Sequence, residues 1–561
     1  MRKKRLCDGL VILLIAAILV VAHFFWFRFD LTQEKRFSIA PQTKELIKNL
    51  DTPITIACYL GGPVDANVAH LKSSMINMVE EFNSYSSTRI RLDFINPSIA
   101  ESDDERIKNY VALEQRGMRG LSVAHKEKNG TISQSVVFPW AYVVIHNDSL
   151  LIPLIENNSQ ASTEELISHS IEDLEFKLTD AIRSLSKQDI DKVAFIEGHG
   201  ELEEEFVYDA ESALSRYFQI DRGSFTSDAT ALDNYKAIVI AQPKEKFSEA
   251  DKYIIDQYFM NGGRVLWLID GIEFSEKTLA KSGISPILPL DVNLQDMLFK
   301  YGVRILPSVL EDMQCAYTPI NIAPIGQPAQ FEALPWFYAP LLITSPYHPI
   351  TKNSMQVKAN FASALEFTNN SNDVTKDVLL VTSNATRISK APTEINLSAM
   401  TKIDPQTYFN THYLPVAVAM QGFFPSVFTH RMMPTTITNS HQKKDVSQKT
   451  RMIVVADGDI IKNELENKNN SVGVIPLGYD RVTKQLFGNK NFIVNSLLYL
   501  TDDENWLSLR NRTIKLRLIN QAVSSTNRTF WQCINVLFPL LLLGILGSIY
   551  LLVRRHKNKI M

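Results

Sequence analysis

Two long apolar runs, one near each end, constrain this chain more than any other feature of its sequence. They cover residues 10–27 and 536–553, and only His23 interrupts the first run. A helix of about 20 apolar residues crosses the ~30 Å hydrocarbon core of a bilayer. A helix also satisfies its own backbone hydrogen bonds where water is absent. We therefore expect one membrane-spanning helix over residues 10–27 and a second over residues 533–553.

Basic residues beside both runs predict their orientation. Residues 2–5 are all Lys or Arg, and two Arg and two Lys lie within residues 554–559. Basic residues next to a span favour the cytoplasmic side of the membrane. We expect a two-pass protein of the bacterial inner membrane, with both termini cytoplasmic. The basic tails are residues 1–9 and 554–561, and the main domain lies in the periplasm.

A cleaved signal peptide is the alternative interpretation of the first run. Its apolar region would span about 7 to 15 residues and end at a small-residue cleavage site. Here the run ends in Phe24-Phe25-Trp26-Phe27. Large aromatic residues are typical of a membrane interface. The sequence therefore favours a retained anchor.

Composition and motifs exclude several classes of function. The net charge is -3, so the chain lacks the basic excess typical of nucleic-acid binding. Its four cysteines form no C-x-x-C pair, which argues against a zinc knuckle or a redox pair. The sequence contains no P-loop, no G-x-S-x-G and no H-E-x-x-H motif. We expect no cofactor, no metal and no nucleic-acid partner.

Residues 28–188 are predicted to form a first extracytoplasmic α/β domain. Apolar residues 53–60 and 90–95 read as short strands, and between them apolar side chains recur at spacings of three and four, which indicates a helix. A strand–helix–strand unit of this length predicts parallel pairing. Residues 136–144 and 150–155 then predict a hairpin.

A single helix is expected to follow that hairpin. Ser162 and Glu165 form a capping box at its start, and the apolar face continues to Leu185. This helix would close the first domain.

Residues 189–505 are predicted to form a second, larger α/β domain. Short apolar runs alternate with helical patterns, which is typical of a doubly wound, mostly parallel sheet with helices on both faces, amidotransferase-like or Rossmann-like. The expected strands are 193–197, 237–241, 265–269, 303–306, 377–382, 415–420 and 452–456. Helices are expected near 207–217, from Ser248 to Gly262-Gly263, and over 294–301.

Two segments lack such a pattern. Residues 428–449 are polar and aperiodic, so we expect a mobile loop there. Residues 506–532 are expected to form a juxtamembrane segment before the second span.

Polar residues at the ends of predicted strands are the candidate site. Glycines and acidic residues follow a strand in Phe195-Ile196-Glu197-Gly198-His199-Gly200-Glu201, and similar ends carry Asp270 and the pair Asp457 and Asp459. Doubly wound sheets bind ligands at this edge. The candidate ligand-binding residues are Glu197, His199, Glu201, Asp270, Asp457 and Asp459, with no catalytic and no metal-binding residue.

A purely structural role for the same residues is the alternative. Glycine shapes a strand-to-helix turn, and acidic residues at positions 201–205 favour the positive end of the following helix. An Asp after a strand can likewise cap a helix. The sequence leaves both interpretations open.

The chain also resembles the GldG family, the membrane-anchored subunits of the gliding-motility-associated ABC transporter of Bacteroidota. The resemblance rests on the order of several short segments: residues 28–36, 195–201, 452–463 (MIVVADGDIIKN), 476–480 (PLGYD), 488–500 (GNKNFIVNSLLYL) and the C-terminal anchor with Arg554-Arg555. It implies an outer domain similar to a module of an intraflagellar-transport subunit and to amidotransferase-like folds without their catalytic residues. It also implies two partners on separate chains, a multispanning permease and a cytoplasmic ATPase.

Together these features predict a non-enzymatic outer subunit of an ABC-type transport complex. One alternative is a solute-binding domain for that transporter, with the strand-end residues around its ligand. The other is a hydrolase or metalloenzyme that uses His199 with Glu197 and Glu201.

Overall fold

The computed structural model describes residues 38–62, 64–126, 132–155, 163–187, 190–321, 323, 327–328, 330–368, 373–397, 404–468, 471–511 and 528–559. The chain divides into two compact units, residues 1–512 and 513–561, and each is described by itself. The expected first span, residues 10–27, lies outside the described residues, and so does Ser162 of the predicted capping box.

A four-stranded mixed sheet forms the first part of the described chain. Its order is β2-β1-β5-β6, with β1 parallel to β2 and antiparallel to β5, and β5 antiparallel to β6. The parallel unit and the hairpin are therefore both confirmed. The elements here are α2 (Pro41–Lys48), β1 (Ile54–Cys58), α3 (Ala66–Asn83), β2 (Arg91–Phe94), α4 (Asp103–Gln115), β3 (Leu121–Lys126), β4 (Ile132–Val137), β5 (Trp140–Ile145), β6 (Asp148–Pro153), α5 (Thr163–Glu172) and α6 (Leu174–Ser186).

The predicted single helix after this hairpin is two helices, α5 and α6, which are separated at Asp173. Asp competes for backbone hydrogen bonds and favours helix ends over helix interiors. The apolar spacing on either side of Asp173 fits one continuous helix, so periodicity alone did not reveal the break.

A larger sheet carries the rest of this unit. Its order is β15-β16-β19-β22-β23-β10-β9-β7-β8, and β17 pairs with β16. The strands are β7 (Asp191–Glu197), β8 (Phe218–Ser224), β9 (Ala237–Ala241), β10 (Val265–Leu268), β15 (Cys315–Asn321), β16 (Phe331–Thr344), β17 (Val357–Lys358), β19 (Val374–Val381), β22 (Pro415–Gly422) and β23 (Thr450–Val455). The helices against it are α7 (Glu204–Leu214), α8 (Glu249–Met260) and α13 (Asn489–Thr501).

The expectation of a mostly parallel sheet holds for only part of this sheet. Strands β8, β7, β9, β10 and β23 run parallel, but β22, β19, β16 and β15 continue the sheet in antiparallel pairs. Parallel neighbours need a crossover, whereas antiparallel neighbours can be joined by a loop that returns at the same end. The chain from Gly422 to Thr450 is such a loop, since these two residues are register partners.

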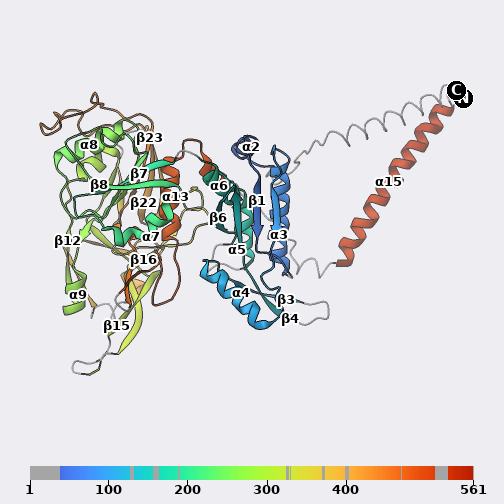
Figure 1. Ribbon diagram of the computed structural model, residues 1–561, viewed down its shortest axis with the longest axis horizontal. Coiled ribbons are helices and arrows are strands. Elements are labelled where there is room, and N and C mark those ends of the chain that lie inside the picture. Colours follow the sequence, from blue (N-terminus) through green and yellow to red (C-terminus); the bar gives the residue numbers. More distant parts are fainter. Residues whose placement is uncertain are drawn as a thin grey trace. The chain divides into compact units, whose positions relative to one another are not determined.

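Helices cover both faces of this sheet, as Figure 1 shows for α8 and α13. Side chains of β7 alternate between two cores: Val193 and Phe195 pack with α7 and α13, while Ala194 and Ile196 pack with α8. A strand buried on both faces has no polar side to show in its sequence. This explains why the strands read as continuous apolar runs.

The remaining described elements of this unit follow β10 in the chain and lie outside the large sheet. They are β11 (Ile272–Glu273), α9 (Glu276–Ser282), β12 (Ile284–Pro289), α10 (Gln295–Tyr301), β13 (Val303–Ile305), β14 (Ser308–Asp312), β18 (Leu365–Phe367), β20 (Thr386–Lys390), β21 (Thr393–Asn396), α12 (Pro405–Tyr408), the 3-10 helices η1 (Gly458–Ile461) and η2 (Trp506–Asn511), β24 (Leu465–Lys468) and β25 (Ser471–Val474). The predicted strand at 303–306 is present as β13, but it pairs with β18 outside the main sheet.

Residues 423–449, which join β22 to β23, are held to α8 and α10 by one buried carboxylate. Asp256 of α8 accepts hydrogen bonds from the Ser426 hydroxyl at 2.7 Å, the Val427 amide at 3.0 Å and the Tyr301 hydroxyl at 2.9 Å. Asp256 has no solvent exposure, and burial raises its pKa. The segment has no regular helix or strand, and the mobility expected for 428–449 stays a prediction.

The second unit contains one described helix, α15 (Arg528–Lys559). Its stretch Phe530–Leu552 has a mean hydropathy of 2.2 and is long and apolar enough to cross a membrane. This stretch agrees with the span expected over 533–553.

Removing the Asp256 carboxylate should release the 423–449 segment. Asp256→Ala leaves several buried donors without a partner, which costs about 3 kcal/mol of folding free energy. We expect a lower melting temperature for the full-length chain and faster limited proteolysis within 423–449. Asp445→Ala is the matched control, because Asp445 lies in the same segment with its side chain 54% exposed. Equal effects of the two substitutions would contradict the role of Asp256.

Candidate functional site

The six candidate residues all lie where strands of the parallel half end. Glu197 is the last residue of β7, and His199 and Glu201 follow it. Asp270 follows β10, and Asp457 and Asp459 follow β23. Because these strands run parallel, their carboxyl ends share one edge of the sheet. Five of the six fall into two groups along that edge, and Glu197 lies apart from both.

His199 is the centre of the first group. Its Nδ1 lies 3.1 Å from Glu201 and its Nε2 lies 3.2 Å from Asp251 at the start of α8. Its ring stacks on Phe247, with 3.7 Å between ring centroids. Burial disfavours the charged imidazolium, but the hydrogen bonds that its ring donates to Asp251 and Glu201 outweigh this effect and raise the pKa of His199 to about 9. His199 is therefore a charged link between the turn after β7 and α8.

Glu197 does not join this group. It pairs with Arg222 of β8 at 2.6 Å, and the same guanidinium also reaches Glu211 of α7 at 2.5 Å. The predicted trio of Glu197, His199 and Glu201 therefore does not converge on one point. This arrangement favours the structural interpretation of that turn and removes the geometry that a hydrolase based on it would need.

Asp270, Asp457 and Asp459 form the second group. The Gln242 amide nitrogen bridges Asp270 at 3.0 Å and Asp459 at 2.8 Å. The backbone amide of Gly458 donates to Asp270 at 2.6 Å, and that of Asp459 donates to Asp457 at 2.7 Å. These three carboxylates follow two different strands, β10 and β23, and the fold brings them together.

Cations and amides surround this acidic group. Lys244 donates to Asp270 at 2.6 Å, and Lys462 lies 3.3 Å from Asp459. Asn360 donates its backbone amide to Asp457 at 2.7 Å and its side-chain amide to Asp459 at 3.0 Å. The oxygens of the three carboxylates thus accept from the protein itself. Among the described residues, no group of three His, Cys, Asp or Glu side chains could hold a metal ion.

The protonation of these carboxylates follows from burial and mutual repulsion. Burial raises the pKa of Asp270, and the charge of Asp459 adds to this effect while Lys244 opposes it. Burial also raises the pKa of Asp457 well above its usual range, with further contributions from Asp459 and Asp270. The raised pKa values of Asp270 and Asp457 favour their protonated forms, which relieves the repulsion between neighbouring carboxylates.

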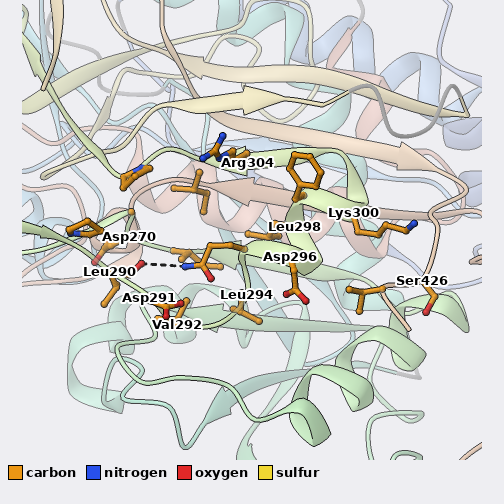
Figure 2. Close-up of a pocket in the computed structure, with 18 of the residues that line it drawn as sticks. Asp270, Leu290, Asp291, Val292, Leu294, Asp296, Leu298, Lys300, Arg304 and Ser426 are labelled. Carbon is orange, nitrogen blue, oxygen red and sulfur yellow. Dashed lines mark hydrogen bonds between the residues drawn. The ribbon is translucent and has the colours of Figure 1, made fainter. Parts of the chain in front are cut away.

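A cavity of about 780 Å³ opens beside Asp270 at the carboxyl end of β10 (Figure 2). Its walls come from the turn after β10, residues 289–300, residues 304–307 and residues 426–431. The 423–449 segment, which Asp256 anchors, therefore supplies one wall. A second cavity of about 660 Å³ lies on the other side of the acidic group and includes Asn360, Asp459 and Lys462 in its lining.

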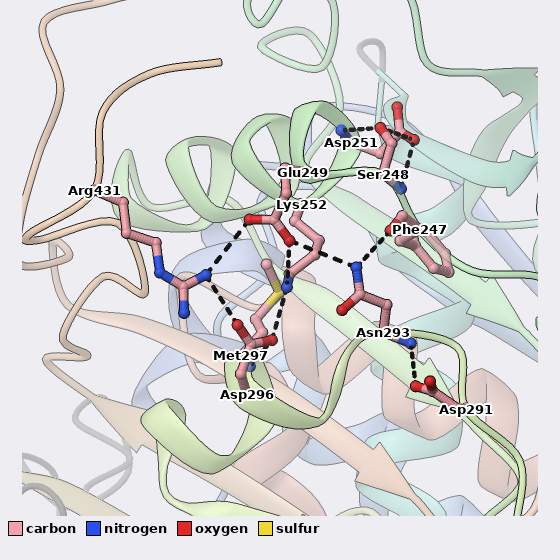
Figure 3. A network of polar contacts seen from close by, with 10 residues as sticks. All are labelled: Phe247, Ser248, Glu249, Asp251, Lys252, Asp291, Asn293, Asp296, Met297 and Arg431. Carbon is pink, nitrogen blue, oxygen red and sulfur yellow. Dashed lines mark hydrogen bonds and ion pairs between the residues drawn. The ribbon is translucent and has the colours of Figure 1, made fainter.

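An ion-pair network joins the elements that form one wall of this cavity, and two of its members, Asp296 and Arg431, line the cavity (Figure 3). Lys252 of α8 is 1% exposed and pairs with Glu249 at 3.0 Å and with Asp296 of α10 at 2.8 Å. Arg431 pairs with Asp296 at 3.0 Å and with Glu249 at 3.5 Å. Helices α8 and α10 and the 423–449 segment thus share one set of charges.

Several residues of these groups were not predicted from the sequence. Gln242 and Lys244 follow the predicted strand at 237–241, so the rule that located Asp270 could also have located them. Gln242 has a backbone φ of 57°, in the left-handed region, which directs the chain after β9. Asn360 precedes no predicted element, and no sequence signal identifies it.

Two family models match the chain. A family model described as an ABC-type uncharacterized transport system matches residues 191–496, and a domain of unknown function matches residues 33–144. No curated protein matches the chain. A solved structure titled mmIFT52 N-terminal domain is similar at 11% identity and a TM-score of 0.30, over 56% of this chain and 99% of that chain.

The charge on His199 predicts a specific pH dependence of stability. Its pKa is raised on folding from 6.5 to about 9, so its stabilisation is complete below pH 6.5 and is lost as the pH rises through about 9. We expect the difference in melting temperature between the wild-type chain and His199→Gln to shrink over that range. A difference that stays constant or grows with pH would show that His199 is not held as an imidazolium.

A double-mutant cycle tests the pairing inside the acidic group. Lys244→Met leaves Asp270 facing Asp459, so adding Asp270→Asn should recover part of the loss. We expect a coupling on the order of 1 kcal/mol, because Lys244 is partly exposed and solvent screens the pair. The matched control is the more exposed pair of Lys246 and Asp291, for which the coupling should be smaller. Thermal melting of the full-length variants gives both values, and additive losses at the first pair would contradict the pairing.

Proposed function

The chain belongs to the family described as an ABC-type uncharacterized transport system, and we propose that it is a non-catalytic, membrane-anchored subunit of such a transport complex. The observation that carries the proposal is the family match over residues 191–496. These residues contain the larger sheet from β7 onward and most of α13. The apolar helix α15 supports a membrane location for the same chain.

In this proposal, other chains carry out translocation and ATP hydrolysis. A multispanning permease and a cytoplasmic ATPase are the expected partners. Both termini would lie in the cytoplasm, and the two sheets would lie in the periplasm. The resemblance to the GldG family favours this arrangement.

The candidate site supports a non-catalytic role through its internal pairing. His199 is paired with Glu201 and Asp251, and Glu197 is paired with Arg222. A general acid or base needs to reach a substrate atom directly or through one water. Side chains already satisfied by one another are better suited to holding loops in place.

A second candidate function is ligand capture for the transporter. The observation that favours it is the cavity of about 780 Å³ at the end of β10. Pockets for drug-sized ligands measure about 300–1,000 Å³. In this alternative the subunit would present a bound molecule to the permease, and Asp270 would lie beside that molecule.

Affinity purification of the tagged full-length chain from native membranes tests the proposal. We expect a multispanning protein and a P-loop ATPase to copurify in near-equal amounts in mild detergent, as measured by quantitative mass spectrometry. An unrelated two-span protein with the same tag is the control. Recovery of the chain alone, or only with itself, would contradict the proposal.

Substitutions in the strand-end turn separate a structural subunit from an enzyme. Glu197→Gln should leave both copurification and transport unchanged, because Glu197 contacts Arg222 and lies apart from His199. A folded and fully assembled Glu197→Gln complex that no longer transports would instead indicate a catalytic or substrate-binding role.

A further inference from the structure

The cavity at the end of β10 has an apolar body. Its lining includes Ile269, Leu290, Val292, Leu294 and Leu298, which are each at most 9% exposed. Binding becomes more favourable when a ligand displaces water from the apolar surface of a pocket. The apolar body therefore favours an apolar group as its occupant.

Three carboxylates also line the cavity, and each is already paired with a lysine. Asp270 is paired with Lys244 at 2.6 Å, Asp291 with Lys246 at 2.6 Å and Asp296 with Lys252 at 2.8 Å. None of these lysines lines the cavity. Each of these carboxylates thus has a lysine partner outside the lining, and Asp296 also pairs with Arg431 of the lining at 3.0 Å, so the three offer little attraction to a cationic ligand.

Two cations of the lining, Lys300 and Arg304, are not paired with any carboxylate of the lining. The side chain of Lys300 in α10 makes no hydrogen bond or ion pair to any residue that the structure describes. Arg304 of β13 has one long contact of 3.7 Å, to the exposed Glu366. Both are labelled among the lining residues in Figure 2. They leave positive charge at the cavity that no carboxylate of its lining neutralises.

We propose that this cavity binds a drug-sized molecule with an apolar body and one anionic group, which Lys300 or Arg304 receives. A carboxylate or phosphate gains a charge-assisted hydrogen bond from either cation. The volume of about 780 Å³ fits such a molecule. The anion can be carried by a flexible alkyl chain or by a rigid aromatic body, and the cavity chemistry is the same for both.

This inference deepens the second candidate function by naming its ligand class. It does not require that the chain copurify with a permease, because binding is a property of the cavity itself. Loss of binding with intact copurification would therefore refute only the ligand assignment. Binding without copurification would refute only the transporter assignment.

The test uses the full-length chain in nanodiscs of phosphatidylcholine, with empty nanodiscs as the blank. Decanoate represents the flexible source and 4-phenylbenzoate the rigid source. Uncharged 1-decanol and 4-phenylbenzamide are their matched controls. We expect saturable binding of at least one anion by calorimetry, with a rise in melting temperature, because a ligand of the native state stabilises it. Binding should weaken with added salt.

Substitutions then test which of the two cations binds the anionic group. We expect Lys300→Met or Arg304→Met to weaken anion binding by about tenfold, the value of one charge-assisted contact. Lys281→Met is the matched control, because Lys281 lies in the last turn of α9 outside the cavity lining. It should leave binding unchanged. Leu290→Trp should reduce the binding of both anions by filling the apolar body.

Three outcomes would overturn the inference. The first is no saturable binding of either anion above that of empty nanodiscs. The second is equal binding of an anion and its uncharged control. The third is full binding by the double variant of Lys300→Met and Arg304→Met. Melting of each variant without ligand separates a lost contact from a lost fold.

Discussion

Buried carboxylates determine where the loops of the larger sheet lie. A carboxylate removed from water is stable only when donors surround it, so the segments that supply those donors are committed to one position. Asp256 holds residues 426–427 and Tyr301 in this way. Asp312 of β14 accepts from the backbone and hydroxyl of Ser383, and Asp457 accepts from the amide of Asn360. The cavity walls and the acidic group both depend on these contacts.

The same contacts explain why the strand-end residues look reactive in sequence and are structural in the fold. A glycine-rich turn with Glu, His and Glu has the residue types of a catalytic site. In the structure His199 is shared between Glu201 and Asp251, and its ring stacks on Phe247. A ring held on both nitrogens and on one face has little freedom to approach a substrate. The open space lies two strands away in the sheet, beside Asp270 at the end of β10.

The sequence predicted well those features that local patterns encode. Strand β9 was predicted at the residues where it occurs, and α8 begins with a capping box of Ser248 and Asp251. Helix α10 ends at Gly302, whose φ of 112° is accessible to glycine. Strand direction was harder to predict, because β19 and β22 read as apolar runs in either orientation. The grouping of Asp270 with Asp459 through Gln242 depends on tertiary pairing, which no local pattern contains.

Lys252 illustrates how such pairing restricts change over evolution. Its ammonium group is sealed between Glu249 and Asp296, and Arg431 shares both carboxylates. Loss of the lysine alone would leave the carboxylates of Glu249 and Asp296 without this partner where the two helices meet the 423–449 segment. These four positions must therefore be inherited or replaced as a set among descendants of this chain. The solvent-exposed pair of Lys246 and Asp291 is free to drift one residue at a time.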